Sequence, residues 1–300
     1  MKKTLFYAAA AVLLLTACTN DETNAQLENS DIISLSASVS GNNTRASLSD
    51  ADIQNTQFVA DRSIYVEAYK TGVATTYTTG TYTTGANGAM TGSLKYPADG
   101  TNIDIMAYHP AQNGENNVTS SLTSFVVGTD QTSVINYQDS DLMYATKLTN
   151  KAKGTTHELT FTHALARIVV NLTADASIDD ASLTHLTCVT INGTKTTATI
   201  TSGVWQSEAG SVADINITGT TKASHSGIIV PQTVAAETTF ITITYNGNAL
   251  TYKIPAGGKT FAAGNSYTYN FTVKASSITL QSSSITAWTN ENIAGGDLVI

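Results

Sequence analysis

Residues 241–254 read ITITYNGNALTYKI and indicate the fold class. Apolar and polar residues alternate on both sides of an Asn-Gly dipeptide. This pair is preferred in a two-residue type I′ turn because both of its positions take φ > 0. In the register that such a turn sets, Ile243 faces Leu250 and Ile241 faces Tyr252. We therefore expect an antiparallel hairpin with one buried face.

The same period of two residues recurs along the chain, between Gly, Asn and Pro turn signals. The expected strands cover residues 33–39, 63–70, 75–84, 103–108, 122–127, 159–165, 168–172, 267–273 and 278–288. The apolar parity changes between Ala164 and Arg167, which predicts a bulge or a short break there. Residues 189–200 predict a second hairpin around Asn192-Gly193. No amphipathic helix of ten or more residues is evident, so we expect an all-β fold of sandwiches or barrels.

Composition supports this fold class. The 300 residues include 50 threonines and 27 serines, and threonine favours strands over helices. Apolar residues make up 41% of the chain, enough to build cores, which argues against disorder. Only 13% of residues are charged and the net charge is −8, so a basic surface for nucleic acid is not expected.

The N-terminus has the pattern of an export signal. Lys2 and Lys3 precede an apolar run that ends in Leu15-Thr16-Ala17-Cys18. The run is too short to span a bilayer, and its last four residues resemble a bacterial lipobox. We expect a signal peptide at residues 1–17 and a lipid on Cys18 that anchors the protein to the outer membrane. The alternative is an ordinary signal peptide with a cysteine near its end.

Two apolar segments lie where strand edges are expected. The strand at residues 33–39 precedes a loop that contains Arg45, and Asp297-Leu298-Val299-Ile300 ends the chain. Removal of the first strand would open a slot, and the last strand of a neighbour could fill a similar slot by β-strand addition. Such head-to-tail contacts produce a filament. A lysine-bearing stretch at residues 149–155 is the expected linker between two halves.

Residues that would suggest catalysis or metal binding are few. The five histidines lack metal-ligand spacing, and His163 is expected to be a hydrogen-bonded core residue. Gly257-Gly258-Lys259-Thr260 resembles the end of a P-loop but fits a turn better. Asp139 and Asp141 lack the rest of a calcium loop, and Cys188 reads as a small buried residue. We expect no catalytic site, no metal and no cofactor.

An ordered set of motifs resembles the fimbrillin family, the subunits of type V pili. These motifs are Leu15-Thr16-Ala17-Cys18, Thr44-Arg45-Ala46, Ala107-Tyr108-His109-Pro110, Asp141-Leu142-Met143-Tyr144-Ala145, Phe161-Thr162-His163-Ala164-Leu165-Ala166-Arg167-Ile168, Gly264-Asn265-Ser266-Tyr267-Thr268-Tyr269 and Ile285-Thr286-Ala287-Trp288. The resemblance implies two tandem transthyretin-like Greek-key β-sandwich domains, at residues 46–150 and 151–300. A lipidated propeptide at residues 18–45 would precede them and contain the first strand.

The resemblance also implies a route of assembly. An Arg-specific protease would cut after Arg45, so that Ala46 becomes the first residue of the mature subunit. The segment Leu298, Val299 and Ile300 would then enter the groove of another pilin subunit, the same or different, in an extracellular fimbrium. Host or bacterial surface ligands are further expected partners, and nucleic acid is not. The alternatives are a fimbrial tip or adhesin subunit, and a surface lipoprotein that binds glycans on Trp205 or Trp288.

Overall fold

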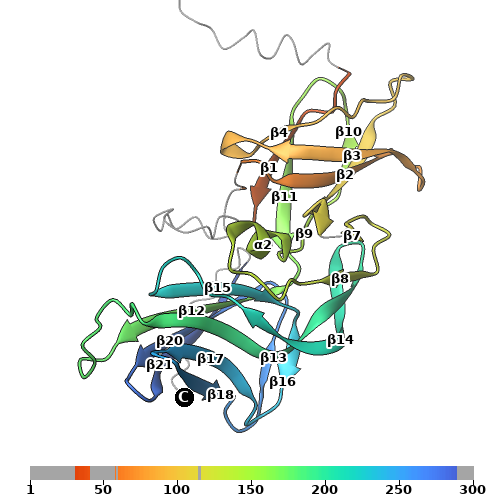
Figure 1. Ribbon diagram of the computed structural model, residues 1–300. Helices are drawn as coiled ribbons and strands as arrows, with labels where there is room; N and C mark the ends of the chain where they lie inside the picture. Colours follow the sequence, from red (N-terminus) through yellow and green to blue (C-terminus); the bar gives the residue numbers. More distant parts are fainter. Residues whose placement is uncertain (1–30, 41–57, 59, 114–115, 289–300) are drawn as a thin grey trace, which may run out of the picture.

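The computed structural model describes residues 31–40, 58, 60–113 and 116–288. The described chain is almost entirely β, with two groups of strands that lie one above the other in Figure 1. The described residues include two short helical segments, η2 (Ala86–Gly88) and α2 (Val134–Asp139). The all-β fold class expected from the sequence is confirmed. In the part of the chain that the structure describes, no helix is long and apolar enough to cross a membrane.

The first group is one eight-stranded sheet. Its strands, in spatial order, are β10 (Leu148–Lys151), β5 (Ile103–His109), β2 (Ser63–Lys70), β3 (Thr76–Thr84), β4 (Ala89–Thr91), β1 (Leu35–Val39), β11 (His157–His163) and β9 (Met143–Ala145). Because β9 also pairs with β5, seven of the strands form a closed ring. The inward side chains form one core, which includes Ile64, Ile103 and Phe161.

The second group consists of two sheets that face each other. One sheet has the order β15 (Ser224–Ile229), β12 (Ala166–Ala174), β20 (Asn265–Val273) and β21 (Ile278–Ala287). The other has the order β14 (Val204–Asn216), β13 (Leu186–Thr201), β17 (Thr239–Tyr245) and β18 (Asn248–Lys253), and β8 (Ser124–Val126) also pairs with β13. Apolar residues of both sheets share a second core, as expected for a β-sandwich.

Two small ribbons complete the described strands. They are β16 (Gln232–Val234) with β19 (Lys259–Phe261), and β6 (Gln112–Asn113) with β7 (Asn116–Asn117). The P-loop-like sequence lies at the start of β19, where Gly257 and Gly258 have φ values of 99° and 76°. The backbone N–H of Gly258 donates to the carbonyl of Pro255 at 3.1 Å. This is a turn, as the sequence indicated.

The hairpin at residues 241–254 has the expected register. In β17 and β18, Ile243 pairs with Leu250 and Ile241 with Tyr252. The second expected hairpin is wrong, because β13 runs without interruption through Asn192-Gly193. Gly193 has a φ of 62°, and the pairing of β13 with β14 shifts register beside it. The dipeptide therefore forms a bulge within a long strand rather than a turn.

The change from the first core to the second lies between β11 and β12. β11 ends at His163 and β12 begins at Ala166, which confirms the break that the parity change predicted. Leu159 of β11 belongs to the first core, and Ile168 of β12 to the second. The first sheet thus extends past residue 150, the boundary expected from the linker, because β11 pairs with β1 and β9.

Candidate functional site

The residues expected to carry lipidation, cleavage and polymerisation lie outside the described residues. They are Cys18, Arg45, Ala46, Leu298, Val299 and Ile300. The structure does describe β1, which precedes Arg45 in the chain, and the residues up to Trp288, which precede the C-terminal segment. The site is therefore built from β1 and the groove that β1 occupies.

The strand β1 lies between β11 and β4 in the first sheet (Figure 1). It pairs in parallel with β11, with Leu35 opposite His157 and Val39 opposite Phe161. It pairs antiparallel with β4, where Leu35 lies opposite Met90. A strand with a neighbour on each side carries two ladders of hydrogen bonds, so β1 is an internal strand of the ring.

Alternation decides which side chains of β1 face the core. Four inward side chains are almost fully buried, with exposures between 0% and 5%: Ile33, which lies two residues before β1, and Leu35, Ala37 and Val39 of β1. The intervening serines are only partly buried. The apolar side chains therefore fill a row of positions along the floor of the groove, as a period of two requires.

Hydrogen bonds fix both ends of this segment. The N–H of Ile33 donates to the carbonyl of Leu94 at 2.8 Å, and the N–H of Ser40 donates to the carbonyl of Phe161 at 2.7 Å. The hydroxyl of Tyr82 donates to the carbonyl of Ile33 at 2.7 Å. Burial raises the pKa of Tyr82 to about 12, so this hydroxyl stays protonated at neutral pH.

The backbone of β1 also approaches Gly88 closely. Gly88 has a φ of 75°, a conformation that favours glycine. A Cβ at this position would lie 2.2 Å from the carbonyl oxygen of Ala37. The wall of the groove is therefore shaped to the main chain of the strand that fills it.

Positive charge gathers where β1 begins. The ammonium of Lys153 lies 2.7 Å from a carboxylate oxygen of Asp31, and the backbone of Lys95 forms an isolated antiparallel β-bridge with that of Ile32. The hydrogen bond and charge of Lys153, with a smaller effect of Lys95, hold the pKa of Asp31 below its usual value. The backbone N–H of Tyr96 donates to the carbonyl of Asp31 at 2.8 Å. This end of the groove therefore holds a carboxylate.

A buried polar cluster lies where β11 ends. His163 Nδ1 is 2.9 Å from Asp141 Oδ1, and both side chains are fully buried. The imidazole of His163 stacks on Trp288 with 3.6 Å between ring centres, and Arg167 lies 6.0 Å from the Trp288 ring. The expectation of a hydrogen-bonded core histidine is confirmed. The parts of this cluster come from three separate motifs, with His163 and Arg167 in the same one, and the sequence did not predict that the motifs meet.

Other residues that the sequence analysis considered for catalysis, metal binding or ligand stacking have structural roles. Asp141 is engaged by His163, and Trp288 is only 5% exposed, so it is no open stacking platform. Cys188 is partly buried rather than fully buried, with its sulfur 3.3 Å from Thr190 Oγ1. Among the described residues, no group of three or more His, Cys, Asp or Glu could hold a metal ion.

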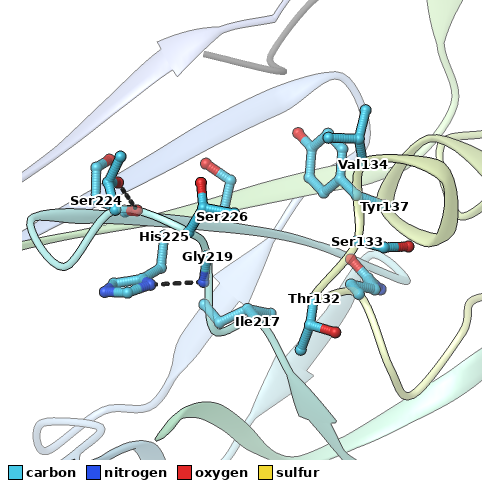
Figure 2. A pocket seen from close by; sticks show the side chains of 12 residues that line it. Thr132, Ser133, Val134, Tyr137, Ile217, Gly219, Ser224, His225 and Ser226 are labelled. Atoms are coloured by element: carbon cyan, nitrogen blue, oxygen red, sulfur yellow. Dashed lines mark hydrogen bonds between the residues drawn. The ribbon is translucent and has the colours of Figure 1, made fainter. Parts of the chain in front are cut away.

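A small hollow of about 110 Å³ lies in the second sandwich, where the segment before α2 faces residues 217–226 (Figure 2). His225 accepts a hydrogen bond at Nδ1 from the N–H of Gly219 at 2.9 Å, and burial lowers its pKa to about 4. The hydroxyls of Thr132 and Ser224 are bonded to protein groups. These polar groups stabilise the loops around the hollow.

A family model described as fimbrillin-like matches residues 19–288. No curated protein matches significantly. A candidate cell adhesion protein from Bacteroides uniformis has 26% identity and a TM-score of 0.64, and the alignment covers 87% of this chain and 100% of that one.

Two further solved structures are similar at lower identity. A candidate cell adhesion protein from Bacteroides ovatus has 16% identity and a TM-score of 0.61, with 87% of this chain and 99% of that one covered. The tip fimbrial protein Mfa3 from Porphyromonas gingivalis, solved with a C-terminal truncation, has 12% identity and a TM-score of 0.49, with 85% and 99% covered. At 16% identity the likeness to the Bacteroides ovatus protein concerns the fold alone.

Proposed function

The chain belongs to the fimbrillin-like family of structural pilus subunits, which are not enzymes, and on this premise we propose that it is a pilin assembled by donor-strand exchange. The precursor is exported as a lipoprotein with its lipid on Cys18. An Arg-specific protease cuts after Arg45, so that Ala46 becomes the N-terminus. The segment Leu298, Val299 and Ile300 of another subunit then fills the vacated groove, and the subunits form an extracellular fimbrium.

The observation that carries this proposal is the position of β1 in the chain and in the sheet. A cut after Arg45 separates β1 from the rest of the protein, although β1 is an internal strand that, with Ile33 just before it, contributes four buried side chains. Loss of β1 leaves β4 and β11 with unpaired edges that face each other across an apolar floor. An edge of this kind is a template for another strand.

The other two arginines support the choice of Arg45. Arg62 is partly buried directly before β2, and its backbone N–H donates to Thr84 Oγ1 at 2.9 Å. Arg167 is only 7% exposed and lies within β12, paired with Ile228 and Ser266. A protease needs several residues in an extended, accessible form, and ordered strands do not offer this.

The free energy available for strand exchange follows from the side chains that are buried in the groove. Full burial of one Val, Leu or Ile side chain contributes about 1.5–3 kcal/mol. Ile33 together with Leu35, Ala37 and Val39 of β1 therefore contributes about 6 kcal/mol before entropy is counted, and the two ladders add main-chain hydrogen bonds. A strand that replaces β1 with a similar apolar row recovers most of this free energy.

The test is the N-terminus and the assembly state of protein recovered from cells. We expect the first residue to be Ala46, and we expect Arg45→Ala to yield a lipidated monomer. Arg62→Lys, the control, should be processed and assembled normally. Filaments built from Arg45→Ala subunits that retain β1 would contradict the proposal, and so would normal filaments after deletion of Asp297-Leu298-Val299-Ile300.

A further inference from the structure

The strand β15 forms one edge of its sheet in the second sandwich and pairs there with β12. In an antiparallel pair, successive residues point their N–H and C=O groups alternately toward the partner strand and away from it. The N–H of Leu172 donates to the carbonyl of Ala223 at 2.8 Å, which sets this alternation. The main-chain groups of Ser224, Ser226 and Ile228 therefore point outward, away from β12.

Two of these three outward positions are bonded to side chains of the protein. At Ile228, the amide of Gln131 takes the place of a further strand. Its Oε1 accepts from the N–H of Ile228 at 2.7 Å, and its Nε2 donates to the carbonyl of the same residue at 2.9 Å. At Ser224, the hydroxyl of Thr221 donates to the carbonyl at 3.1 Å. Both ends of this edge are therefore occupied, so an added strand of ordinary length does not fit along it.

Ser226 lies between the two occupied positions. Its outward N–H and C=O have no hydrogen-bond partner among the residues that the structure describes. Gln131 marks the outward side of β15, and the small hollow of about 110 Å³ is lined by both Gln131 and Ser226 (Figure 2). The main-chain groups of Ser226 are therefore open to this hollow. Backbone groups of this kind are strong hydrogen-bonding groups and need a partner from outside the strand.

The rest of the lining is uncharged and combines hydroxyl groups with apolar surface. The hydroxyls belong to Thr132, Ser133, Thr220 and Thr221. Val134 is 42% exposed, and Ile217 is buried beneath the hollow. None of the lining residues is Lys, Arg, Asp or Glu, and His225 is neutral at pH 7. The matching ligand is therefore neutral and carries both hydroxyl and C–H groups.

The contact of Gln131 with Ile228 shows which chemical group fits this edge. The amide carries an acceptor and a donor on the same carbon, and this close pair bonds both main-chain groups of one residue. Two hydroxyls on adjacent carbons of a sugar ring offer a similar pair, because a hydroxyl both donates and accepts. The hollow is also well below the roughly 300–1,000 Å³ of pockets for drug-sized ligands, so it suits a single ring.

We propose that this hollow binds the terminal unit of a neutral glycan, with two adjacent hydroxyls on the N–H and C=O of Ser226 and the C–H face of the ring against Val134. The hydroxyls around the hollow supply further hydrogen bonds to the ring. The hollow shares no lining residue with the groove that β1 fills. The inference therefore goes beyond the proposed assembly and does not depend on donor-strand exchange.

The first test follows the Ser226 amide by nuclear magnetic resonance in the full chain carrying Cys18→Ser. The nitrogen-15-labelled protein is titrated with the methyl glycosides of glucose, galactose and mannose, each up to about 100 mM. At least one should shift the amide signals of Ser226 and Gly219, with a Kd of about 1 mM, because a small open site makes few hydrogen bonds. Cyclohexanol, a ring with a single hydroxyl, should shift neither signal. If none of the three glycosides shifts the Ser226 amide, the inference is overturned.

The second test removes the proposed donor itself. Ser226→Pro lacks the N–H but keeps the ladder to β12, because this N–H points outward and proline is tolerated at strand edges. It should weaken glycoside binding by about tenfold. The matched control Ser226→Ala loses only the hydroxyl, which accepts from Arg167 at 3.3 Å, and should bind as the parent protein does. Equal binding to Ser226→Pro and Ser226→Ala would place the sugar elsewhere and overturn the inference.

A further variant and a rival ligand complete the test. Val134→Ser changes a side chain that is already 42% exposed, so the fold should persist while glycoside binding weakens by about threefold. This variant serves also if proline at position 226 disturbs the sheet, and unchanged binding to it would contradict the contact with the ring. An uncharged capped trialanine peptide is the rival ligand. A shift of the Ser226 amide by this peptide and by no glycoside would show a peptide site and overturn the inference.

Discussion

Replacement of Leu35 by alanine probes how firmly β1 holds the first sheet together. Leu35 is 2% exposed at the centre of the groove, opposite His157 of β11 and Met90 of β4. Substitution of a buried leucine by alanine costs about 2–5 kcal/mol, because the lost transfer free energy adds to the cost of the cavity. We take about 3 kcal/mol for this site, since both neighbouring strands are held in the ring and relax little into the space.

This free energy converts into a large change in exchange rate. At about 1.4 kcal/mol for each factor of ten, a loss of about 3 kcal/mol raises the open population of the sheet about 100-fold. Hydrogen exchange of the full chain with Cys18→Ser, followed by mass spectrometry, measures this population segment by segment. Amides of β11 and β4 should exchange about 100-fold faster in Leu35→Ala, and those of the β17–β18 hairpin should not change.

The control is Ser36→Ala, one residue along the same strand. Its side chain is only partly buried, so the free energy of unfolding should change by less than about 0.5 kcal/mol. If Leu35→Ala left β11 fully protected, β1 would contribute little and its removal would open no groove. If the second sandwich lost protection to the same extent, the two cores would unfold as one unit and the local argument would fail.

Three further changes have defined outcomes. Gly88→Ala should destabilise the precursor by at least 1–2 kcal/mol in urea unfolding, because the added Cβ meets the Ala37 carbonyl and the backbone has a positive φ. An unchanged unfolding midpoint would refute the close approach of Gly88 to the backbone of β1. His163→Ala leaves the buried carboxylate of Asp141 without its partner and should cost about 3–5 kcal/mol by the same assay, whereas a loss below 1 kcal/mol would contradict the pairing. Burial lowers the pKa of His225 to about 4, so on acidification the unfolded chain takes up a proton at this histidine before the folded chain does. The free energy of unfolding should therefore fall as the pH drops from about 6.5 toward 4. His225→Gln should make the free energy of unfolding depend less on pH in this range, and an unchanged slope would refute the assignment.

The local alternation of apolar and polar residues was sufficient to predict most of the strands. The clean alternation of residues 33–39 predicted a strand with one buried face, and β1 has that burial pattern. The register of the β17–β18 hairpin was predicted to the residue because an Asn-Gly turn fixes how the two strands pair. These features depend on contacts close in sequence.

Features that depend on distant contacts were not predictable. The Asn192-Gly193 dipeptide has the same turn chemistry, but β13 is held on both sides by β14 and β17, and this tertiary pairing overrides the local preference. The parallel pairing of β1 with β11 joins residues 122 positions apart, such as Ser34 and Thr156. The ion pair of Lys153 with Asp31 also joins residues 122 positions apart, so the sequence alone gave no signal for it.

The two flanking ladders of β1 have a mechanical consequence. Both ladders run along the strand axis, one to β4 and one to β11. A strand seated in this slot and pulled from one end is loaded in shear, so the bonds of both ladders share the tension instead of opening in sequence. A fibre whose subunits are joined through this slot, as proposed above, would therefore resist stretching better than one whose joints can be peeled apart.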